Sequence, residues 1–485
     1  MQKKSSVIKN FIYNSFYQIL IIIIPLVLTP YLSRTIGADG MGTYSYVFTV
    51  CDYFVLFAML GIKNHGSRMV AKARNDKEKL SDTFWGIYYI QIATFGITSI
   101  AYIIYIIFLC EKVYRTYAII EGIYLLSIAI DFTWFFSGLE EFKSIVIKNT
   151  VVKIMTICFI VIYVKSIDDL WKYILIMSAG YFIGNASLLT RVVKLVSFRK
   201  ISNVEIRANI KPIMVLFISV LAVSLYKSMD KIMIKQLGNV TQLGYYEYAD
   251  KISYIQVCLT TAFGTVMLPR MASLSENIEI LRIKEIIRGA LAGVMCLSLG
   301  ISIGIISICD EFVPLYLGAR YGCVAGTVKL LVISGICVSW ANVLRTLYLI
   351  PFEKDKIYVK SVLAGAALNI ILNAGLIPKL GANGAAIATI GAEASVAVYQ
   401  TICVREVISV KKTLFDMLGI ICSAAIMYSC VDGISQMLDG QIVKLLIQVV
   451  VGVIVYSIMI VGMIKYFRKE WYERLKSGKC ISNNK

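Results

Sequence analysis

The chain has 485 residues, of which 58% are hydrophobic and 16% are charged. Soluble domains are about 45–50% apolar and need polar surface for their whole exterior, so this composition excludes a soluble protein and indicates a chain whose solvent is lipid. The net charge of +19 does not indicate nucleic acid binding, because the basic residues fall in short runs between apolar stretches.

Few residues suit a metal or catalytic centre. Most of the twelve cysteines lie inside apolar runs, as Cys258, Cys296 and Cys337 do, and their spacing is not that of a metal site. The only histidine is His65. The sequence also lacks a phosphate-binding Gly-x-x-x-x-Gly-Lys-Ser/Thr loop. We therefore expect no metal, no cofactor and no direct use of ATP by this chain.

Fourteen segments are long and apolar enough to span a bilayer, which takes about 20 residues each. The first follows a short basic stretch, Met1 to Lys9, and is long enough to be a retained membrane helix rather than a cleaved signal. The predicted spans are 11–33, 43–62, 84–109, 114–137, 145–164, 170–192, 212–236, 246–268, 288–309, 325–350, 357–377, 383–404, 414–432 and 442–464.

The distribution of basic residues orients these spans. With the N-terminus in the cytoplasm, the inside segments carry roughly four times as many lysines and arginines as the outside segments, the asymmetry typical of cytoplasmic loops. This contrast predicts an even number of helices with both termini cytoplasmic. All loops are short, and the longest outer one, 310–324, leaves little room for an extramembrane catalytic domain.

Two stretches of the chain resemble each other. Each has a glycine after the first helix of its half, followed by Gly-x-Tyr-x-Tyr at the start of the next helix, in residues 36–46 and again in residues 237–248. The offset of about 200 residues, or six helices, predicts two parallel repeats, as in transporters whose substrate site lies between repeated halves. We expect an N-terminal lobe at 1–205, a C-terminal lobe at 206–410, and two further helices with a basic tail at 411–485.

Charged residues inside the spans cost about 2.5–3.5 kcal/mol each on insertion scales, so they should face protein or water. The span 212–236 places Lys227, Lys231 and Lys235 on one helix face at i, i+4 and i+8. Asp230 lies three residues after Lys227, as a candidate charge partner. The remaining internal candidates are the acids Asp52, Glu121, Asp131 and Glu393 and the basic residues Lys153 and Arg345, with Arg34 at the outer end of the first span.

Several motifs, in order and at similar spacing, resemble those of the polysaccharide flippases, the O-antigen and capsule repeat-unit transporters of the multidrug/oligosaccharidyl-lipid/polysaccharide exporter superfamily. The resemblance covers roughly residues 10–405. It rests on Asn14-Ser15-Phe16-Tyr17, Pro30-Tyr31-Leu32-Ser33-Arg34, the stretch Tyr53 to Ile62, Asp230-Lys231-Ile232-Met233, Gly244-Tyr245-Tyr246, Leu268-Pro269-Arg270 and the stretch Gly381 to Thr389.

The resemblance implies an all-α, polytopic, V-shaped bundle of two six-helix lobes plus two C-terminal helices, with a central cavity and alternating access. It implies a bacterial cytoplasmic-membrane flippase rather than an enzyme. The implied substrate is an undecaprenyl-pyrophosphate-linked oligosaccharide, and a polysaccharide polymerase is an implied partner. Membrane lipids surround such a protein, and nucleic acid is not an expected partner.

With that substrate, basic residues at membrane depth are candidates for the pyrophosphate, which needs positive charge and hydrogen-bond donors. The candidate substrate-binding residues are Lys227, Lys231, Arg345, Arg34 and Lys153 for the pyrophosphate and Asn14, Gln18 and Tyr226 for the sugars. The alternatives are that lysines reach the interface, that Lys227 and Asp230 form a structural pair, and that Asn14 and Gln18 only link helices.

Two energy sources stay open, an ion gradient of H⁺ or Na⁺ and the membrane potential. The drug-extrusion branch of the superfamily uses a carboxylate in the first helix, which this chain lacks, so Asp52, Glu121, Asp131 and Glu393 are the candidates for ion coupling. Two other functions stay open at this point. One is an ion-coupled drug or cation exporter, which basic residues in the cavity argue against; the other is a membrane glycan polymerase.

Overall fold

The computed structural model describes residues 24–274, 280–437 and 440–467, which are almost entirely helical and contain no β-strand within those ranges. The chain divides into two compact units. The first comprises the residues up to Tyr248 together with Asn373–Ala385, and the second comprises Ala249–Leu372 and the residues from Ala386 onward.

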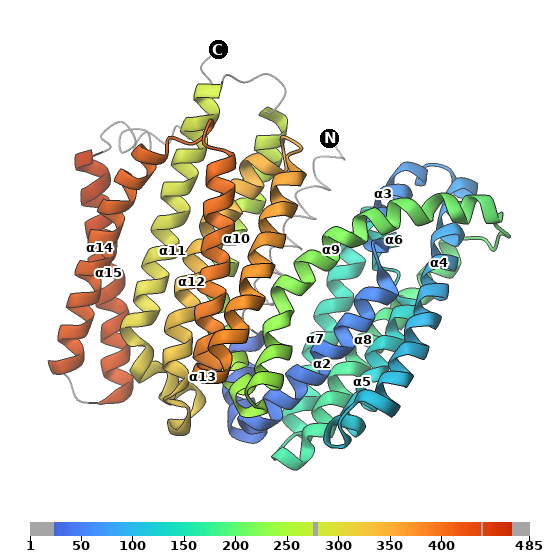
Figure 1. The fold of residues 1–485 in the computed structure, drawn as a ribbon, viewed down its shortest axis with the longest axis horizontal. Helices are drawn as coiled ribbons and strands as arrows, with labels where there is room; N and C mark the ends of the chain where they lie inside the picture. Colours follow the sequence, from blue (N-terminus) through green and yellow to red (C-terminus); the bar gives the residue numbers. More distant parts are fainter. Residues whose placement is uncertain (1–23, 275–279, 438–439, 468–485) are drawn as a thin grey trace. The chain divides into compact units, whose positions relative to one another are not determined.

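The first unit is built from long helices connected by short turns (Figure 1). Residues 24–35 are helical as well. The helices are α2 (Gly37–Met59), α3 (Ile62–Ala73), α4 (Lys77–Ile104), α5 (Lys112–Ser127), α6 (Thr133–Gly138), α7 (Phe142–Tyr163), α8 (Leu170–Leu195) and α9 (Asn203–Leu237), followed by the start of α10 (Val240–Leu274).

The second unit contains the rest of α10 and the helices up to the C-terminal region. The helices are α11 (Ile280–Leu317), α12 (Val324–Leu344) with its π-helical continuation η5 (Arg345–Leu349), α13 (Asp355–Cys403) apart from its residues Asn373–Ala385, which belong to the first unit, α14 (Val410–Met437) and α15 (Gln441–Phe467). The long helix α13 bends at Gly381, where φ is 55° and ψ is −128°. A positive φ suits glycine, and this bend separates the two spans that the sequence predicts at 357–377 and 383–404.

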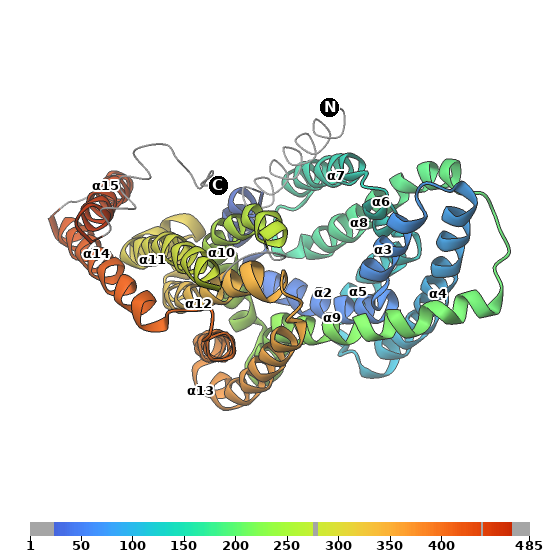
Figure 2. The same cartoon turned by 90° about the horizontal axis from the view of Figure 1, so that it is seen from above.

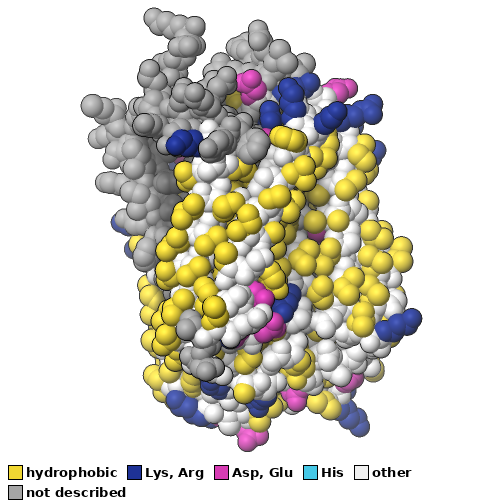
Figure 3. All heavy atoms as spheres, turned by 90° about the vertical axis from the view of Figure 1, so that its left-hand side faces the viewer, with side chains coloured by type: hydrophobic (Ala, Val, Ile, Leu, Met, Phe, Trp, Pro, Cys, Tyr) yellow, Lys and Arg dark blue, Asp and Glu magenta, His cyan; other side chains and the backbone are white. Residues whose placement is uncertain are grey.

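The predicted spans in the described ranges fall on helices, except that the predicted span 114–137 is divided between α5 and α6 by the short turn η2 (Ile128–Ile130) and a break at Asp131 and Phe132. Eleven helices among the described residues are long and apolar enough to cross a membrane, and α10 occupies the predicted span 246–268. The predicted first span lies largely outside the described residues. On the face seen in Figure 3, hydrophobic side chains cover most of the height, and Lys and Arg side chains gather mainly toward its two ends. The predicted fold class, an all-α polytopic membrane protein, is confirmed.

A buried hydrogen-bond network in the first unit links neighbouring helices. Gln91 on α4 is fully buried; its Oε1 accepts from the indole of Trp134 at 2.9 Å, and its Nε2 donates to the carbonyl of Ile128 at 2.7 Å. Phe84 and Phe135 pack around the same indole. Each of these groups would be costly to bury without a partner, so the network fixes α4 against α6.

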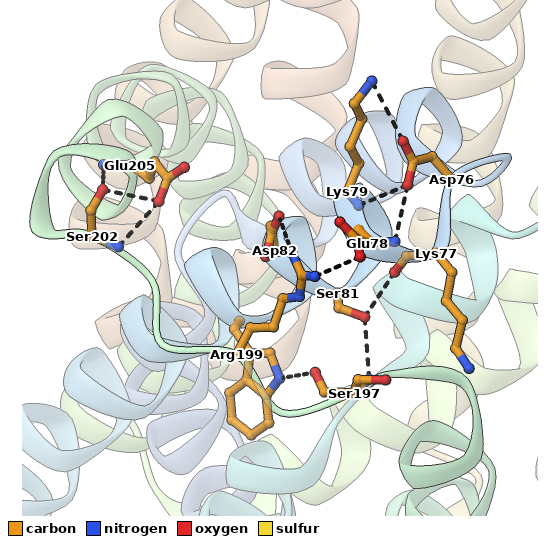
Figure 4. Close-up of polar contacts among 11 residues, drawn as sticks. Asp76, Lys77, Glu78, Lys79, Ser81, Asp82, Ser197, Arg199, Ser202 and Glu205 are labelled. Carbon is orange, nitrogen blue, oxygen red and sulfur yellow. Dashed lines mark hydrogen bonds and ion pairs between the residues drawn. The ribbon is translucent and has the colours of Figure 1, made fainter.

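The segment between α8 and α9 is fastened to the start of α4 (Figure 4). The backbone N–H of Ser197 donates to Ser81, and Ser197 accepts from the indole of Trp85 at 3.0 Å. Arg199 forms ion pairs with Glu78 at 2.9 Å and Asp82 at 3.3 Å, and the hydrogen bond with Glu78 raises the pKa of Arg199. This connection leads directly into α9, whose first turns therefore belong to the first unit.

Capping side chains define where α4 and α9 begin. Asp76 accepts from the backbone N–H groups of Lys79 and Glu78; these bonds, that of Lys79 most, hold the pKa of Asp76 below its ordinary value. Ser202 and Glu205 form a capping box at the start of α9. Seen from above, α9 then runs past α4 toward α2 (Figure 2).

Candidate functional site

The three lysines on one face of α9 have different surroundings. Lys235 forms an ion pair with Glu111 and lies over the ring of Tyr46 at 4.9 Å. Lys231 forms an ion pair with Glu247 at 2.8 Å. Lys227 is exposed and makes no ion pair with the described residues. An anion that bound Lys231 or Lys235 would have to compete with a carboxylate, whereas Lys227 can accept an anion directly.

Asp230 is buried between α9, α10 and α13. Its carboxylate accepts from the hydroxyl of Tyr246 at 3.0 Å and from Nδ2 of Asn373 at 2.8 Å, and the side chain is 4% exposed. The structure shows no ion pair between Asp230 and Lys227. The contacts of Asp230 hold three helices of the first unit together at the level of the lysine face.

Two of the candidate coupling acids lie on adjacent helices of the first unit. Glu121 on α5 is fully buried; one carboxylate oxygen accepts from Ser178 on α8 at 2.9 Å, and the other has no hydrogen-bond partner among the described residues. Asp52 on α2 accepts from the hydroxyl of Tyr124 at 2.9 Å. Buried polar atoms are nearly always hydrogen-bonded, so the unpartnered oxygen of Glu121 marks a place where a proton or cation could bind.

Asp131 has a different setting. It accepts from the backbone N–H of Thr133 at 3.0 Å and from the Thr133 hydroxyl, and it lies 3.7 Å from Nζ of Lys63. These contacts stabilise the turn before α6 and use the carboxylate fully. The same region holds Lys148 on α7, which donates to Asn185 at 3.0 Å.

In the second unit, Arg345 begins the π-helical turn η5. It donates to Oδ1 of Asn342 at 2.8 Å and lies over the ring of Tyr358 at 5.7 Å from the centroid. Its Nε is buried and has no hydrogen-bond partner in the part of the chain that the structure describes. Single π-helical turns are frequent at functional sites, and this guanidinium keeps donor capacity for an anion. Glu393 is half-buried on α13 of the same unit.

The other candidate residues are spread along the chain. Arg34 is exposed and donates to the carbonyl of Pro30 at 3.2 Å. Tyr226 on α9 and Lys153 on α7 are half-buried. Asn14 and Gln18 lie outside the described residues. The first unit therefore gathers Lys227, Lys231, Asp230, Asp52 and Glu121 on packed helices, while Arg345 and Glu393 belong to the second unit.

Sequence reasoning missed two residues that the geometry makes prominent. Glu247 is the partner of Lys231 and also accepts from Ser45. Lys148 occupies a half-buried position inside the predicted span 145–164. Both are charged residues within apolar stretches, the signal by which the other candidates were found.

The amino-terminal half of the chain, residues 7–275, matches the family model described as polysaccharide biosynthesis protein. The chain belongs to this family. The match covers more than half of its residues and all of the first unit's helices up to α10.

Relatives and solved structures extend the comparison beyond those residues. The chain is 23% identical over 417 residues to a protein of Escherichia coli K12 named "Putative O-antigen transporter", covering 83% of this chain and 98% of the other. The structure of a lipid II flippase, MurJ, in an inward closed conformation aligns with a TM-score of 0.76 at 15% identity, covering 94% of this chain and 99% of the other.

A more distant likeness is to a multidrug resistance transporter of the MATE family in an inward-facing conformation. That alignment has a TM-score of 0.59 at 11% identity and covers 79% of this chain and 97% of the other. At these identities the solved structures establish the fold, a membrane-transporter fold.

Proposed function

We propose that the protein is a flippase that carries polyprenyl-pyrophosphate-linked oligosaccharide repeat units from the inner to the outer leaflet of a bacterial cytoplasmic membrane. The observation that carries this proposal is membership of the polysaccharide biosynthesis family combined with similarity over 83% of this chain to a protein named "Putative O-antigen transporter". Cationic side chains at membrane depth, which suit a diphosphate, support it further.

The transport mechanism proposed is alternating access by two six-helix lobes, 1–205 and 206–410, with both termini in the cytoplasm. The two helices at 411–485 follow the second lobe in the sequence. The loops are short, so binding and release must both occur within the membrane-spanning part. The finished repeat units would be passed to a polysaccharide polymerase on the outer side.

For substrate binding we propose Lys227 and Arg345 as the principal pyrophosphate contacts. Lys227 has no carboxylate partner among the described residues, and Arg345 has an unused buried N–H. Arginine can bind two phosphate oxygens at once, whereas lysine acts as a point charge. Lys231, Arg34 and Lys153 are proposed as further cationic contacts, and Tyr226 as a sugar contact.

For energy coupling we propose H⁺ or Na⁺ binding in the first unit, at Glu121 and Asp52. The fully buried position of Glu121 and its unpartnered oxygen support this choice. Asp131 is less suited, because its oxygens are engaged by Thr133 and Lys63.

The proposal is tested by deleting the protein in its own host and locating the lipid-linked repeat units. Loss of a flippase should trap finished single units in the inner leaflet, out of reach of a glycosidase or lectin added to intact spheroplasts. Single units that reach the outer leaflet without being polymerised would indicate a polymerase instead. Unchanged surface glycan with increased drug sensitivity would indicate a drug exporter.

A further inference from the structure

The starts of α2 and α10 cross at two glycines in the first unit. A Cβ placed on Gly42 would lie 1.9 Å from the carbonyl oxygen of Val240, and one placed on Gly244 would lie 2.0 Å from that of Ala38. The two contacts are reciprocal, and the paired positions occupy equivalent places in the two Gly-x-Tyr-x-Tyr stretches. Glycine lets helix backbones approach this closely, so the repeat packs against its own copy.

Polar side chains at equivalent positions also meet across this crossing. Thr241 donates to Asp39, and Ser45 donates to Oε2 of Glu247 at 2.8 Å; in both pairs the residues are 202 positions apart. A third bond runs from the hydroxyl of Tyr248 to the carbonyl of Gly37 at 2.8 Å. The crossing therefore has local two-fold pseudosymmetry, with each helix offering the same surface to the other.

One contact breaks the symmetry. Glu247 also forms an ion pair with Lys231 of α9 at 2.8 Å, and the two side chains are only 12% and 21% exposed. Its symmetry mate on α2 is the neutral Ser45. A single carboxylate thus holds both the hydroxyl of α2 and the cation of α9, about 9 Å from the end of α9 at 1.5 Å per residue.

We propose that Glu247 is a substrate-released latch on the α2–α10 crossing. The inference rests on the proposed function, because its ligand is the diphosphate of the lipid-linked substrate. A diphosphate that binds Lys231 takes that cation from Glu247. A carboxylate left partly buried without its cation is strongly disfavoured, so Glu247 moves to water, its bond with Ser45 is lost, and the two helices separate at Gly42 and Gly244.

The glycine crossing suits such a latch for a physical reason. At Gly42 and Gly244 the two helices meet backbone to backbone, without the interlocking side chains of an ordinary core at that point, although Tyr248 reaches across to Gly37 and has to move when the helices separate. The polar pairs then decide whether the crossing is closed. Glu247 is the one among them that is linked to a cation facing an anionic substrate.

A disulfide across the crossing tests the inference. The double variant Asp39→Cys with Thr241→Cys places two thiols where the hydrogen bond now lies, and each single variant is its control for the native cysteines. Mass spectrometry of tryptic peptides detects the disulfide after oxidation, and export of lipid-linked repeat units is measured before and after reduction. We expect export to fall at least tenfold on oxidation and to return on reduction, in the double variant alone.

A second measurement tests the role of the substrate. In proteoliposomes, undecaprenyl pyrophosphate should slow disulfide formation in the double variant at least threefold, whereas undecaprenol, which lacks the phosphates, should not. Adding Lys231→Gln to the double variant should abolish this effect. The latch is overturned if undecaprenyl pyrophosphate does not change the rate of disulfide formation, or if the two cysteines do not pair at all.

The outcomes separate the latch from the flippase proposal. If the oxidised double variant exports repeat units normally, the latch is wrong and the flippase stands. If deletion of the protein does not trap repeat units in the inner leaflet, the proposed function fails, whatever the disulfide does.

Discussion

Glu121 on α5 accepts a hydrogen bond from Ser178 on α8 at 2.9 Å, while its second carboxylate oxygen is fully buried and has no hydrogen-bond partner within residues 24–274, 280–437 and 440–467. A structural carboxylate would have both oxygens engaged, as Asp131 does with Thr133 and Lys63. The contrast between these two acids distinguishes a candidate coupling residue from one that stabilises a turn.

The first prediction concerns this contrast. Glu121→Gln keeps the size of the side chain and an oxygen for Ser178, but it removes the carboxylate that we propose binds a proton or cation. We expect export in proteoliposomes to become independent of the imposed H⁺ or Na⁺ gradient that accelerates the wild type. The melting temperature in detergent should change little.

Asp131→Asn is the matched control for that experiment. It should lower thermal stability, because Asp131 accepts from two donors of Thr133 and lies beside Lys63, but the gradient should still accelerate its export. A Glu121→Gln protein that responds to the gradient as the wild type does would exclude Glu121 from coupling.

Hydropathy and charge distribution were sufficient to predict the helices, because each span must be long and apolar to cross a bilayer. They could not predict which intramembrane charges are paired. Lys235 meets Glu111 across 124 residues of sequence, and Lys231 meets Glu247 on the next helix; both pairings depend on helix packing. The periodicity of α9 places the three lysines on one face but does not distinguish Lys227 from the other two.

The repeat was visible in the sequence as two similar turns, but its physical consequence was not. The sequence places Gly42 and Gly244 at the start of a helix in each repeat, and in the structure each lies against the backbone of the other repeat. That contact depends on how two helices cross, which a single sequence does not specify.

The second prediction distinguishes Lys227 from Lys112. Replacing Lys227 with Ala removes a cation that has no ion pair among the described residues, and a lost charge-assisted contact of about 1.5–3 kcal/mol corresponds to roughly ten- to hundredfold weaker substrate binding. Export should fall accordingly at matched membrane abundance, and Lys227→Arg should restore most of it. Lys112→Ala, at an exposed lysine that begins α5, should export normally.

The third prediction concerns the geometry of Arg345. Arg345→Lys retains the positive charge but loses the planar donor set that can hold two phosphate oxygens, so it should export more slowly than the wild type. Arg345→Ala should lower the affinity for the substrate by about tenfold or more, in line with the loss of a charge-assisted bond of about 1.5–3 kcal/mol. The measurement is the apparent affinity for undecaprenyl pyrophosphate in nanodiscs. Equal affinity in all three proteins would remove Arg345 from the binding site.

The fourth prediction concerns steric contact at Gly42 and Gly244. Gly42→Ala and Gly244→Ala each place a methyl group about 2 Å from a backbone carbonyl oxygen, which cannot be relieved by a rotamer change. We expect each to destabilise the closed crossing by about 1–3 kcal/mol, the usual cost of overpacking, and to slow disulfide formation between cysteines at positions 39 and 241.

Gly96→Ala is the control for the glycine variants, because a Cβ there has no neighbour within 4 Å and alanine is favoured over glycine in a helix by about 0.5–1 kcal/mol. Its melting temperature should equal or exceed that of the wild type, and cysteines at positions 39 and 241 should oxidise at the same rate with Gly96→Ala as without it. The glycine crossing would lose its steric basis if Gly42→Ala matched Gly96→Ala in both measurements, since a methyl group would then fit where the two repeats are in contact.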